Sequence, residues 1–195
     1  MNELFPIFIK AHETPILIIG GGEVAEEKLH FLLKSSPHAR VKVVAKELTP
    51  GVISFLDNHP NLIVARRAFE PEDLKGKKLV IVAANNPELL EEVKALSEEH
   101  DILMNSADNP PYCDFYLGGI VTKGNLKIAI STNGKAPIIA KRLREFFELN
   151  LPDNLEENLE VLETLRRQLT GDFEKKLSQL NELTKELIEN DQYRN

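Results

Sequence analysis

The sequence predicts a doubly wound α/β fold, in which helices cover both faces of a parallel sheet, followed by a small α+β region and a helical tail. From residue 16 to residue 105, short apolar runs alternate with amphipathic helical patterns, as in the β–α–β units of parallel sheets. Pro110 and Pro111 end this alternation, and leucine-rich helical patterns fill the chain beyond residue 152. We therefore divide the chain into residues 1–112, 113–150 and 151–195.

The first strand, predicted at residues 16–19, runs directly into three glycines and then into a helix. Gly20, Gly22 and Ala25 have the spacing of the dinucleotide fingerprint. The first glycine forms a tight turn, the second lets backbone approach a pyrophosphate, and the small third residue lets the helix pack on the strand. The N–H groups that begin the helix would face the phosphates. A purely structural turn is the alternative. We interpret the turn as the cofactor cradle of a Rossmann-type sheet.

Four more strands and two intervening helices are expected. The strands are at residues 41–45, 62–65, 79–84 and 102–104, and the helices are at 49–58 and 87–99. Asn86 is the expected cap of the second of these helices. Ligands of such sheets bind beyond the carboxyl ends of the strands. Asn85 and Asn86 follow the fourth strand and Asn105 ends the fifth, so we expect all three near the glycine turn.

The chain after residue 112 predicts a β-hairpin and then amphipathic helices. Two strands, 115–121 and 126–131, are joined by a turn that contains Gly124, and a helix begins at Pro137. The apolar stripe of that helix comprises Ile138, Ile139, Leu143, Phe146 and Phe147, and a leucine stripe follows from residue 155 to residue 187. Such stripes must be buried. A second copy of the chain is a natural cover, so we expect a homodimer.

The composition is that of a soluble globular protein, with 195 residues of which 42% are hydrophobic and 28% charged. The sequence has no apolar run long enough to span a membrane and no signal-peptide pattern at its start. Its single cysteine, Cys113, can form neither an internal disulfide nor a thiolate cluster. The five histidines lack metal-ligand spacing, so no metal site is expected. These observations predict a cytoplasmic protein without a membrane partner.

The net charge of −7 is unevenly distributed along the chain. Residues 145–195 carry thirteen acidic and six basic side chains, whereas residues 118–144 carry six basic side chains and no acidic one. A basic surface of this kind suits a polyanionic ligand. Nucleic acid is not expected, because the basic stretch has no interleaved aromatic residues and matches no nucleic-acid motif. The alternative is a solvated face that pairs with the acidic tail or with a partner subunit.

Asp108 is the candidate catalytic residue, because it follows the fifth strand at the edge where ligands bind. A carboxylate beside a bound nicotinamide can take up a proton while hydride leaves to the cofactor. An Asx turn explains the same residue.

A candidate anion pocket lies further along the chain, where Ser131 and Thr132 offer hydroxyls and Lys135 offers a cation. An ordinary loop between a strand and a helix explains these residues equally well.

The residues alone leave the identity of the dinucleotide open. A carboxylate near the end of the second strand usually binds the ribose hydroxyls, and Lys46 and Glu47 occupy this place. Glu47 suits NAD, whereas Lys46 could favour the 2′-phosphate of NADP.

Five motifs occur along the chain in a characteristic order. They are Leu4-Phe5-Pro6-Ile7-Phe8, Gly20-Gly21-Gly22-Glu23-Val24-Ala25 with Lys28, Ala83-Ala84-Asn85-Asn86, Asn105-Ser106-Ala107-Asp108 and Ile130-Ser131-Thr132-Asn133-Gly134-Lys135-Ala136-Pro137. Their combination resembles the precorrin-2 dehydrogenases and covers nearly the whole chain. It also resembles the amino-terminal part of the multifunctional sirohaem synthases, whose methyltransferase part has no counterpart in this sequence.

The resemblance implies that the protein oxidises precorrin-2 to sirohydrochlorin with NAD as hydride acceptor, in a homodimer. It implies that Asp108 is the general base. It also implies that Glu23, Val24, Lys46 and Glu47 contact the cofactor, which favours NAD.

The substrate that the resemblance implies is an anionic tetrapyrrole, which gives the basic stretch a role in binding carboxylates. The substrate-binding candidates are Asn105, Ser131, Thr132, Lys135, Lys141 and Arg142. Some members of the family also insert ferrous iron into sirohydrochlorin, so a ferrochelatase activity is a further expectation. A serine that is phosphorylated in some members aligns with Thr132 or Ser131, and that regulation is not carried over. The alternative function is an NAD-sensing regulatory module without catalysis.

Overall fold

The computed structural model describes residues 2–107, 109–153, 155–168 and 177–182. The chain divides into two compact units. The first comprises Met1–Ile120 with Ala129–Arg144, and the second comprises Val121–Ile128 with the chain from Glu145 onward. Among the described residues, no helix is both long enough and apolar enough to cross a membrane.

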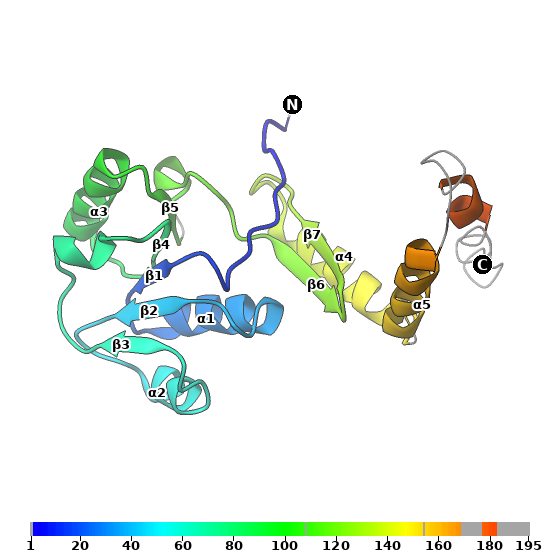
Figure 1. Cartoon of the computed structure of the whole chain (residues 1–195). Helices are drawn as coiled ribbons and strands as arrows, with labels where there is room; N and C mark the ends of the chain where they lie inside the picture. The colour runs from blue at the N-terminus through cyan, green and yellow to red at the C-terminus, as the bar shows by residue number, and fades with distance from the viewer. Residues whose placement is uncertain (1, 108, 154, 169–176, 183–195) are drawn as a thin grey trace. The chain divides into compact units, whose positions relative to one another are not determined.

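The first unit contains a fully parallel, five-stranded sheet in the order β3-β2-β1-β4-β5 (Figure 1). Its strands are β1 (Ile16–Ile19), β2 (Val41–Val44), β3 (Ile63–Ala65), β4 (Leu79–Val82) and β5 (Leu103–Ser106). All four residues of the central strand β1 are buried, as its purely aliphatic sequence requires. Ile19 lies opposite Val44 and Val82, so the carboxyl ends of the three central strands are level. The predicted doubly wound, Rossmann-type sheet is confirmed.

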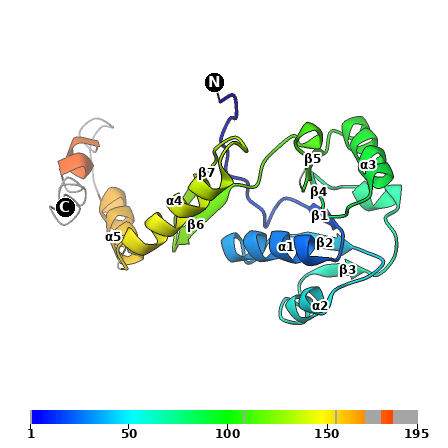
Figure 2. The same cartoon turned by 180° about the vertical axis from the view of Figure 1, so that it is seen from behind.

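Helices cover both faces of this sheet (Figure 2). One core cluster joins α1 (Glu23–Ser35) and α2 (Pro50–Asp57) to one face of the sheet, and the other joins α3 (Pro87–Glu99) and the 3-10 turn η1 (Pro71–Leu74) to the opposite face. In β1, Ile16 and Ile18 belong to the first cluster, whereas Leu17 and Ile19 belong to the second. The alternation along each strand thus fixes the sheet from both sides.

The element boundaries of the sheet lie within two residues of the predicted ones, with the largest shifts at the ends of β4 and β5. Asn86 caps α3 as expected, since its Oδ1 accepts a hydrogen bond from the N–H of Leu89 at 3.1 Å. β4 ends at Val82, before the predicted residue 84. β5 continues through Ser106, because its pairing with β4 extends to Val82. Asn105 therefore lies within a strand and not at its end.

In the described residues after the sheet, the chain forms a second 3-10 turn, η2 (Pro110–Tyr112), a hairpin, two longer helices and a short helical segment at residues 177–182. The hairpin strands are β6 (Gly119–Lys123) and β7 (Leu126–Ile130), which form a separate two-stranded sheet. The helices are α4 (Pro137–Asn150) and α5 (Leu155–Gln168). The hairpin, the helix that begins at Pro137 and the following helix are confirmed. The first hairpin strand begins at Gly119, four residues later than the predicted residue 115.

Contacts within the second unit attach the tip of the hairpin to the start of α5. The ammonium group of Lys123 donates to the Leu151 carbonyl and to the Asp153 carboxylate, at 2.7 Å in each case. The Asn125 N–H donates to the Glu156 carboxylate at 2.6 Å. Residues 169–176 and 183–187 of the predicted leucine stripe lie outside the described residues.

Candidate cofactor and substrate site

The glycine turn is enclosed by backbone on two sides. Gly20 has φ +128°, in the region that favours glycine, and a Cβ there would overlap the Ala83 carbonyl. A Cβ on Gly21 would overlap the Glu47 carbonyl. By contrast, a Cβ on Gly22 would meet no atom within 4 Å. The first two glycines are therefore required by the fold, and Gly22 leaves open space in front of the turn.

Helix α1 begins directly behind this space without a side-chain cap. Its N-cap is Gly22, and no side chain accepts a hydrogen bond there. The first N–H groups of a helix carry partial positive charge and need acceptors, so this end suits a pyrophosphate. Ala25 is completely buried against the sheet, as the fingerprint requires. Glu23 and Val24, the predicted cofactor contacts, are both exposed beside the open space.

The other predicted cofactor residues follow neighbouring strands at the same edge of the sheet. Lys46 and Glu47 are exposed after β2, and the Glu47 backbone packs against the glycine turn through Gly21. Asn85 and Asn86 are exposed after β4. The side-chain oxygen of Asn86 is engaged in capping α3, which leaves its amide nitrogen for a ligand.

The end of β5 is held by side-chain contacts. Asn105 is only 5% exposed, and its Nδ2 donates to the Phe115 carbonyl at 2.8 Å. The next residue but one, Ala107, donates its N–H to the Val82 carbonyl at 3.1 Å. Asp108 itself lies outside the described residues. What the structure adds for this candidate base is the position of its two neighbours, Ala107 and Asn109.

A cavity of about 780 Å³ lies within the first unit. Its walls come from α1, from residues 116–120 and 130–134, and from the first half of α4. Of the predicted substrate residues, Ser131, Thr132 and Lys141 line it. The described residues that form its walls do not include Asn105, Lys135 or Arg142, and the last two are exposed elsewhere on the surface.

The cavity combines an apolar wall with basic side chains. Its apolar lining comprises Phe31, Leu32, Tyr116, Leu117, Ile120, Ile130 and Ile138. Lys28, Lys141 and Arg144 supply the basic groups, and Lys28 also pairs with Glu27 at 3.1 Å. Lys28 belongs to the glycine-turn motif and Arg144 to the basic stretch, but neither was among the individual substrate-binding candidates. Helical spacing could have found both. Lys28, Phe31, Leu32 and Ser35 lie three or four residues apart on α1, and Arg144 lies three residues after Lys141 on α4.

The loop before α4 is shaped by local hydrogen bonds. Asn133 and Gly134 both have positive φ, at 54° and 72°. The Ser131 hydroxyl accepts from the Asn133 N–H, and the Thr132 hydroxyl accepts from the Ala136 N–H, at 3.2 Å in each case. Both hydroxyls therefore help to build the loop, and each keeps its own proton available for an acceptor.

A buried ion cluster stabilises the sheet away from these residues. Asp73 in η1 has a side chain that is 1% exposed and receives hydrogen bonds from both Arg67 nitrogens at 2.8 Å and from Lys42 at 2.7 Å. Burial alone would raise the pKa of Asp73, but the bonds from Arg67, Lys42 and the Glu70 N–H hold it well below its usual range. The cluster ties η1 to β2 and to the chain after β3.

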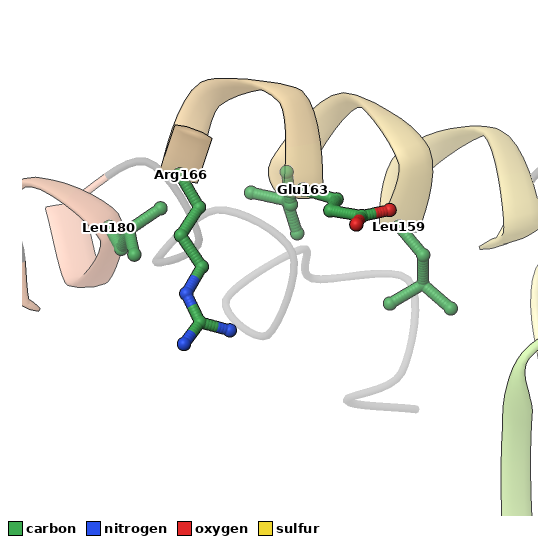
Figure 3. Close-up of a pocket in the computed structure, with 5 residues that line it drawn as sticks. Leu159, Glu163, Arg166 and Leu180 are labelled. Carbon is green, nitrogen blue, oxygen red and sulfur yellow. The ribbon is translucent and has the colours of Figure 1, made fainter. Parts of the chain in front are cut away.

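A smaller hollow of about 310 Å³ lies in the second unit and is lined by Leu180 and by four residues of α5, namely Leu159, Leu162, Glu163 and Arg166 (Figure 3). Leucines dominate it, and the predicted site residues are not among the described residues that line it. We interpret it as packing of the leucine stripe. Across the described part of the chain, no cluster of three or more His, Cys, Asp or Glu side chains could hold a metal ion.

Comparison with known proteins identifies two family models along the chain. The model described as "Putative NAD(P)-binding" matches residues 7–119, and the model described as "Sirohaem biosynthesis protein central" matches residues 123–148. The first covers the sheet and the glycine turn. The second covers most of the hairpin and of α4.

Curated relatives and a solved structure agree with these matches. The sirohaem synthase of Ruthia magnifica subsp. Calyptogena magnifica is 37% identical over 152 residues, which are 78% of this chain and 31% of the relative. That of Vesicomyosocius okutanii subsp. Calyptogena okutanii is 35% identical over 173 residues, 89% of this chain and 36% of the relative. The chain thus spans about a third of the length of these relatives.

The structure of SirC, a precorrin-2 dehydrogenase, superimposes with a TM-score of 0.70 at 25% identity and covers 98% of this chain and 92% of its own. The chain therefore belongs to the NAD(P)-binding family of the sirohaem synthases and precorrin-2 dehydrogenases, which confirms the resemblance carried by its motifs.

Proposed function

We propose that this chain oxidises precorrin-2 to sirohydrochlorin with NAD as the hydride acceptor. The observation that carries the proposal is that one compact unit combines an uncapped helix end behind a glycine turn with a cavity lined by three basic side chains. The first suits a dinucleotide, and the second suits an apolar ring system that bears carboxylates. The likeness to a precorrin-2 dehydrogenase over almost the whole chain supports the same pair of ligands.

The backbone of the glycine turn would hold the dinucleotide. Gly22 leaves room for the pyrophosphate, and the N–H groups of Glu23 and Val24 would bind its oxygens. The Glu47 carboxylate would accept hydrogen bonds from the ribose hydroxyls and repel a 2′-phosphate. The Lys46 ammonium group would instead attract a 2′-phosphate. We favour NAD because the Glu47 backbone packs against Gly21, which places the Glu47 side chain next to the glycine turn.

Asp108 would remove the proton from the substrate. Oxidation of precorrin-2 removes two hydrogens, one as hydride and one as a proton. Bound nicotinamide supplies the hydride acceptor, and the carboxylate of Asp108 would accept the proton. The position of this residue in the sequence, directly after Ala107 at the ligand-binding edge of the sheet, supports the role.

Substrate binding would use the cavity and its basic side chains. Lys28, Lys141 and Arg144 would pair with carboxylates of the tetrapyrrole, while the apolar wall would pack against its ring system. The hydroxyls of Ser131 and Thr132 would donate to further carboxylate oxygens. Three other candidates rest on the sequence alone, namely Lys135, Arg142 and Asn105. The side-chain amide of Asn105 already donates a hydrogen bond to the Phe115 carbonyl.

A homodimer would cover α4. Although this helix carries an apolar stripe, none of its residues is buried in the single chain. Five of its large apolar residues are between 41% and 84% exposed, namely Ile138, Ile139, Leu143, Phe146 and Leu149, while Phe147 is half-buried. A second copy would bury them. We therefore assign residues 1–112 to NAD binding, 113–150 to dimerisation and substrate binding, and 151–195 to a helical region.

The direct test is an anaerobic incubation of the purified protein with precorrin-2 and NAD. We expect sirohydrochlorin and NADH to appear in equal amounts, measured by absorbance. The matched variant Asp108→Asn should bind NAD as tightly as the parent and lose most of its turnover. Protein that binds NAD but forms no sirohydrochlorin would contradict the proposal.

The same protein tests the alternatives. A regulatory NAD-sensing module would bind NAD and show no affinity for precorrin-2 in calorimetry. Replacement of NAD by NADP tests the assignment of the cofactor, and a lower KM for NADP than for NAD would overturn it. Incubation of sirohydrochlorin with ferrous iron in the absence of NAD tests the expected ferrochelatase activity.

A further inference from the structure

The loop that follows β5 is closed at its base by paired contacts. Met104 in β5 donates its N–H to the Asp114 carboxylate at 2.8 Å, and the Asp114 N–H donates to the Met104 carbonyl at 2.7 Å. Lys94 of α3 holds the same carboxylate at 2.8 Å, and this bond raises the pKa of Lys94. Asp114 is therefore fixed beside Met104 at the base of the loop.

The side chain of Cys113 makes a second set of contacts with this loop, next to the Met104–Asp114 pair. Its sulfur accepts a hydrogen bond from the Ser106 N–H at 3.3 Å. Its thiol proton is within reach of the Ser106 carbonyl at 3.2 Å and the Asn109 carbonyl at 3.5 Å. Nδ2 of Asn105 also points to the sulfur, at 3.6 Å. Because β5 is an edge strand, the N–H and carbonyl of Ser106 have no neighbouring strand on this side among the described residues, and the Cys113 thiol provides their hydrogen bonds instead.

The contacts of this loop reach both neighbours of Asp108. Ala107 is anchored to β4 through Val82, and its carbonyl accepts from the Asn109 side chain at 3.2 Å. The Asn109 carbonyl accepts from the Tyr112 N–H at 3.1 Å and lies within reach of the Cys113 thiol. Ala107 is thus held mainly by β4, whereas the contacts of Asn109 lie within the segment between Ser106 and Cys113 or involve the Cys113 thiol.

We infer that Cys113 is a positioning residue for the reaction: its thiol holds Ser106 and Asn109, which lie on either side of Asp108 in the sequence, and through them it supports the proposed base. This inference rests on the proposed function, in which Asp108 is the base. Proton transfer needs a heavy-atom distance within hydrogen-bond reach, and a displacement of about 1 Å can lower a rate about a hundredfold. The thiol acts through Asp108 and need not touch the substrate.

Four variants test the inference: Cys113→Ala, Cys113→Ser, Asp108→Asn and the double variant Cys113→Ala/Asp108→Asn. We expect Cys113→Ala to lower kcat about ten- to a hundredfold while the Kd for NAD changes less than about twofold. Cys113→Ser should recover part of the loss, because a hydroxyl keeps a donor and an acceptor at the same place. The double variant should turn over no more slowly than Asp108→Asn, because the thiol has nothing left to position.

A core variant far from the loop provides the matched control. Val41→Ala removes methyl groups from a buried residue at the start of β2, at the end of the strand away from the ligand-binding edge, and should lower the Tm without the loss of kcat. If Cys113→Ala keeps full kcat, or if the double variant is slower than Asp108→Asn by the same factor, the inference is overturned.

Two further outcomes separate this inference from the proposed function. Undiminished turnover of Asp108→Asn would remove the base itself and the inference with it, whatever Cys113→Ala does. A large loss in Asp108→Asn with none in Cys113→Ala overturns the inference alone. If Cys113→Ala does not fold by circular dichroism, Cys113→Ser with and without Asp108→Asn gives the same comparison. Failure of both cysteine variants to fold shows a structural role and overturns positioning.

Discussion

The glycine turn and helix α4 differ in how completely one chain builds them. Around the turn, Gly20 meets the Ala83 backbone and Gly21 meets the Glu47 backbone, and the helix that follows is anchored by a fully buried Ala25. By contrast, α4 has no buried residue in the single chain. The cofactor half of the proposed site is thus fixed by contacts within one chain. In the substrate half, the apolar face of α4 stays exposed in the single chain, and we propose that a second copy buries it.

The largest effect should come from filling the turn. Gly20→Ala would place a Cβ against the Ala83 carbonyl at a positive φ and should lower the free energy of unfolding by about 4 kcal/mol, measured in urea. Gly22→Ala is the matched control, because its Cβ would meet open space. That variant should keep stability within about 1 kcal/mol and weaken NAD binding. Equal stability of the two variants would remove the distinction between an enclosed and an open glycine.

The ion cluster around Asp73 should have the next largest effect. Asp73→Asn leaves Arg67 and Lys42 together without their shared carboxylate and should lower the free energy of unfolding by about 2–3 kcal/mol, since both cations keep partial access to solvent. The folded-state pKa of Asp73 is depressed, so its contribution is present above the unfolded value of about 4 and is lost as pH falls through the folded pKa. Urea titrations between neutral pH and about pH 3 should show a steeper loss in the parent than in the variant.

A charge on the exposed face of α4 should weaken dimerisation without affecting the cofactor half of the proposed site. Phe146 is 56% exposed, and in the homodimer proposed above Phe146→Asp should raise the dissociation constant at least about tenfold, measured by analytical ultracentrifugation. NAD affinity should stay unchanged, because the turn is complete without the partner. Ile63→Ser, at a 63% exposed residue of β3, is the control and should leave the dimer intact. A loss of NAD affinity in Phe146→Asp would mean that the cofactor half also depends on the partner.

The smallest effect concerns the basic side chains. Lys141→Ala should raise the KM for precorrin-2 about five- to tenfold, because one ion pair in a partly enclosed cavity contributes about 1 kcal/mol. Lys135→Ala should change KM less, since Lys135 is outside the residues that line the cavity. The difference should shrink as salt is added. A larger effect for Lys135 would place the substrate against another surface.

Much of the first unit is predictable from local sequence. The strand, the glycine spacing and the cap at Asn86 each depend on residues close together in the chain, and the structure has all three. The burial of Asn105 was not predictable, because it depends on a contact with Phe115, ten residues away, and on a strand that continues past its apolar run. Composition also gave no sign of the loop contacts made by Cys113.

The basic stretch shows a second limit of sequence reasoning. Lys141 and Arg142 are adjacent in sequence, yet only Lys141 lines the cavity, because successive residues of a helix point about 100° apart. Pro137, Lys141 and Arg144 share a face at steps of four and three residues, and all three line the cavity. Helical spacing, applied to charged as well as apolar residues, would have shown that Lys141 and not Arg142 shares the face of Pro137 and Arg144. The number of basic residues in a stretch of sequence does not show this.

Thr49 connects the glycine turn to a helix that no ligand needs to touch. Its N–H donates to the Gly21 carbonyl at 2.9 Å, while its hydroxyl accepts from Val52 and its carbonyl accepts from Ile53 in the first turn of α2. Any tightening of the turn is therefore passed to the start of α2 through one residue. Amide hydrogen exchange at Val52 and Ile53 should slow when NAD is added, which makes α2 a remote reporter of cofactor occupancy.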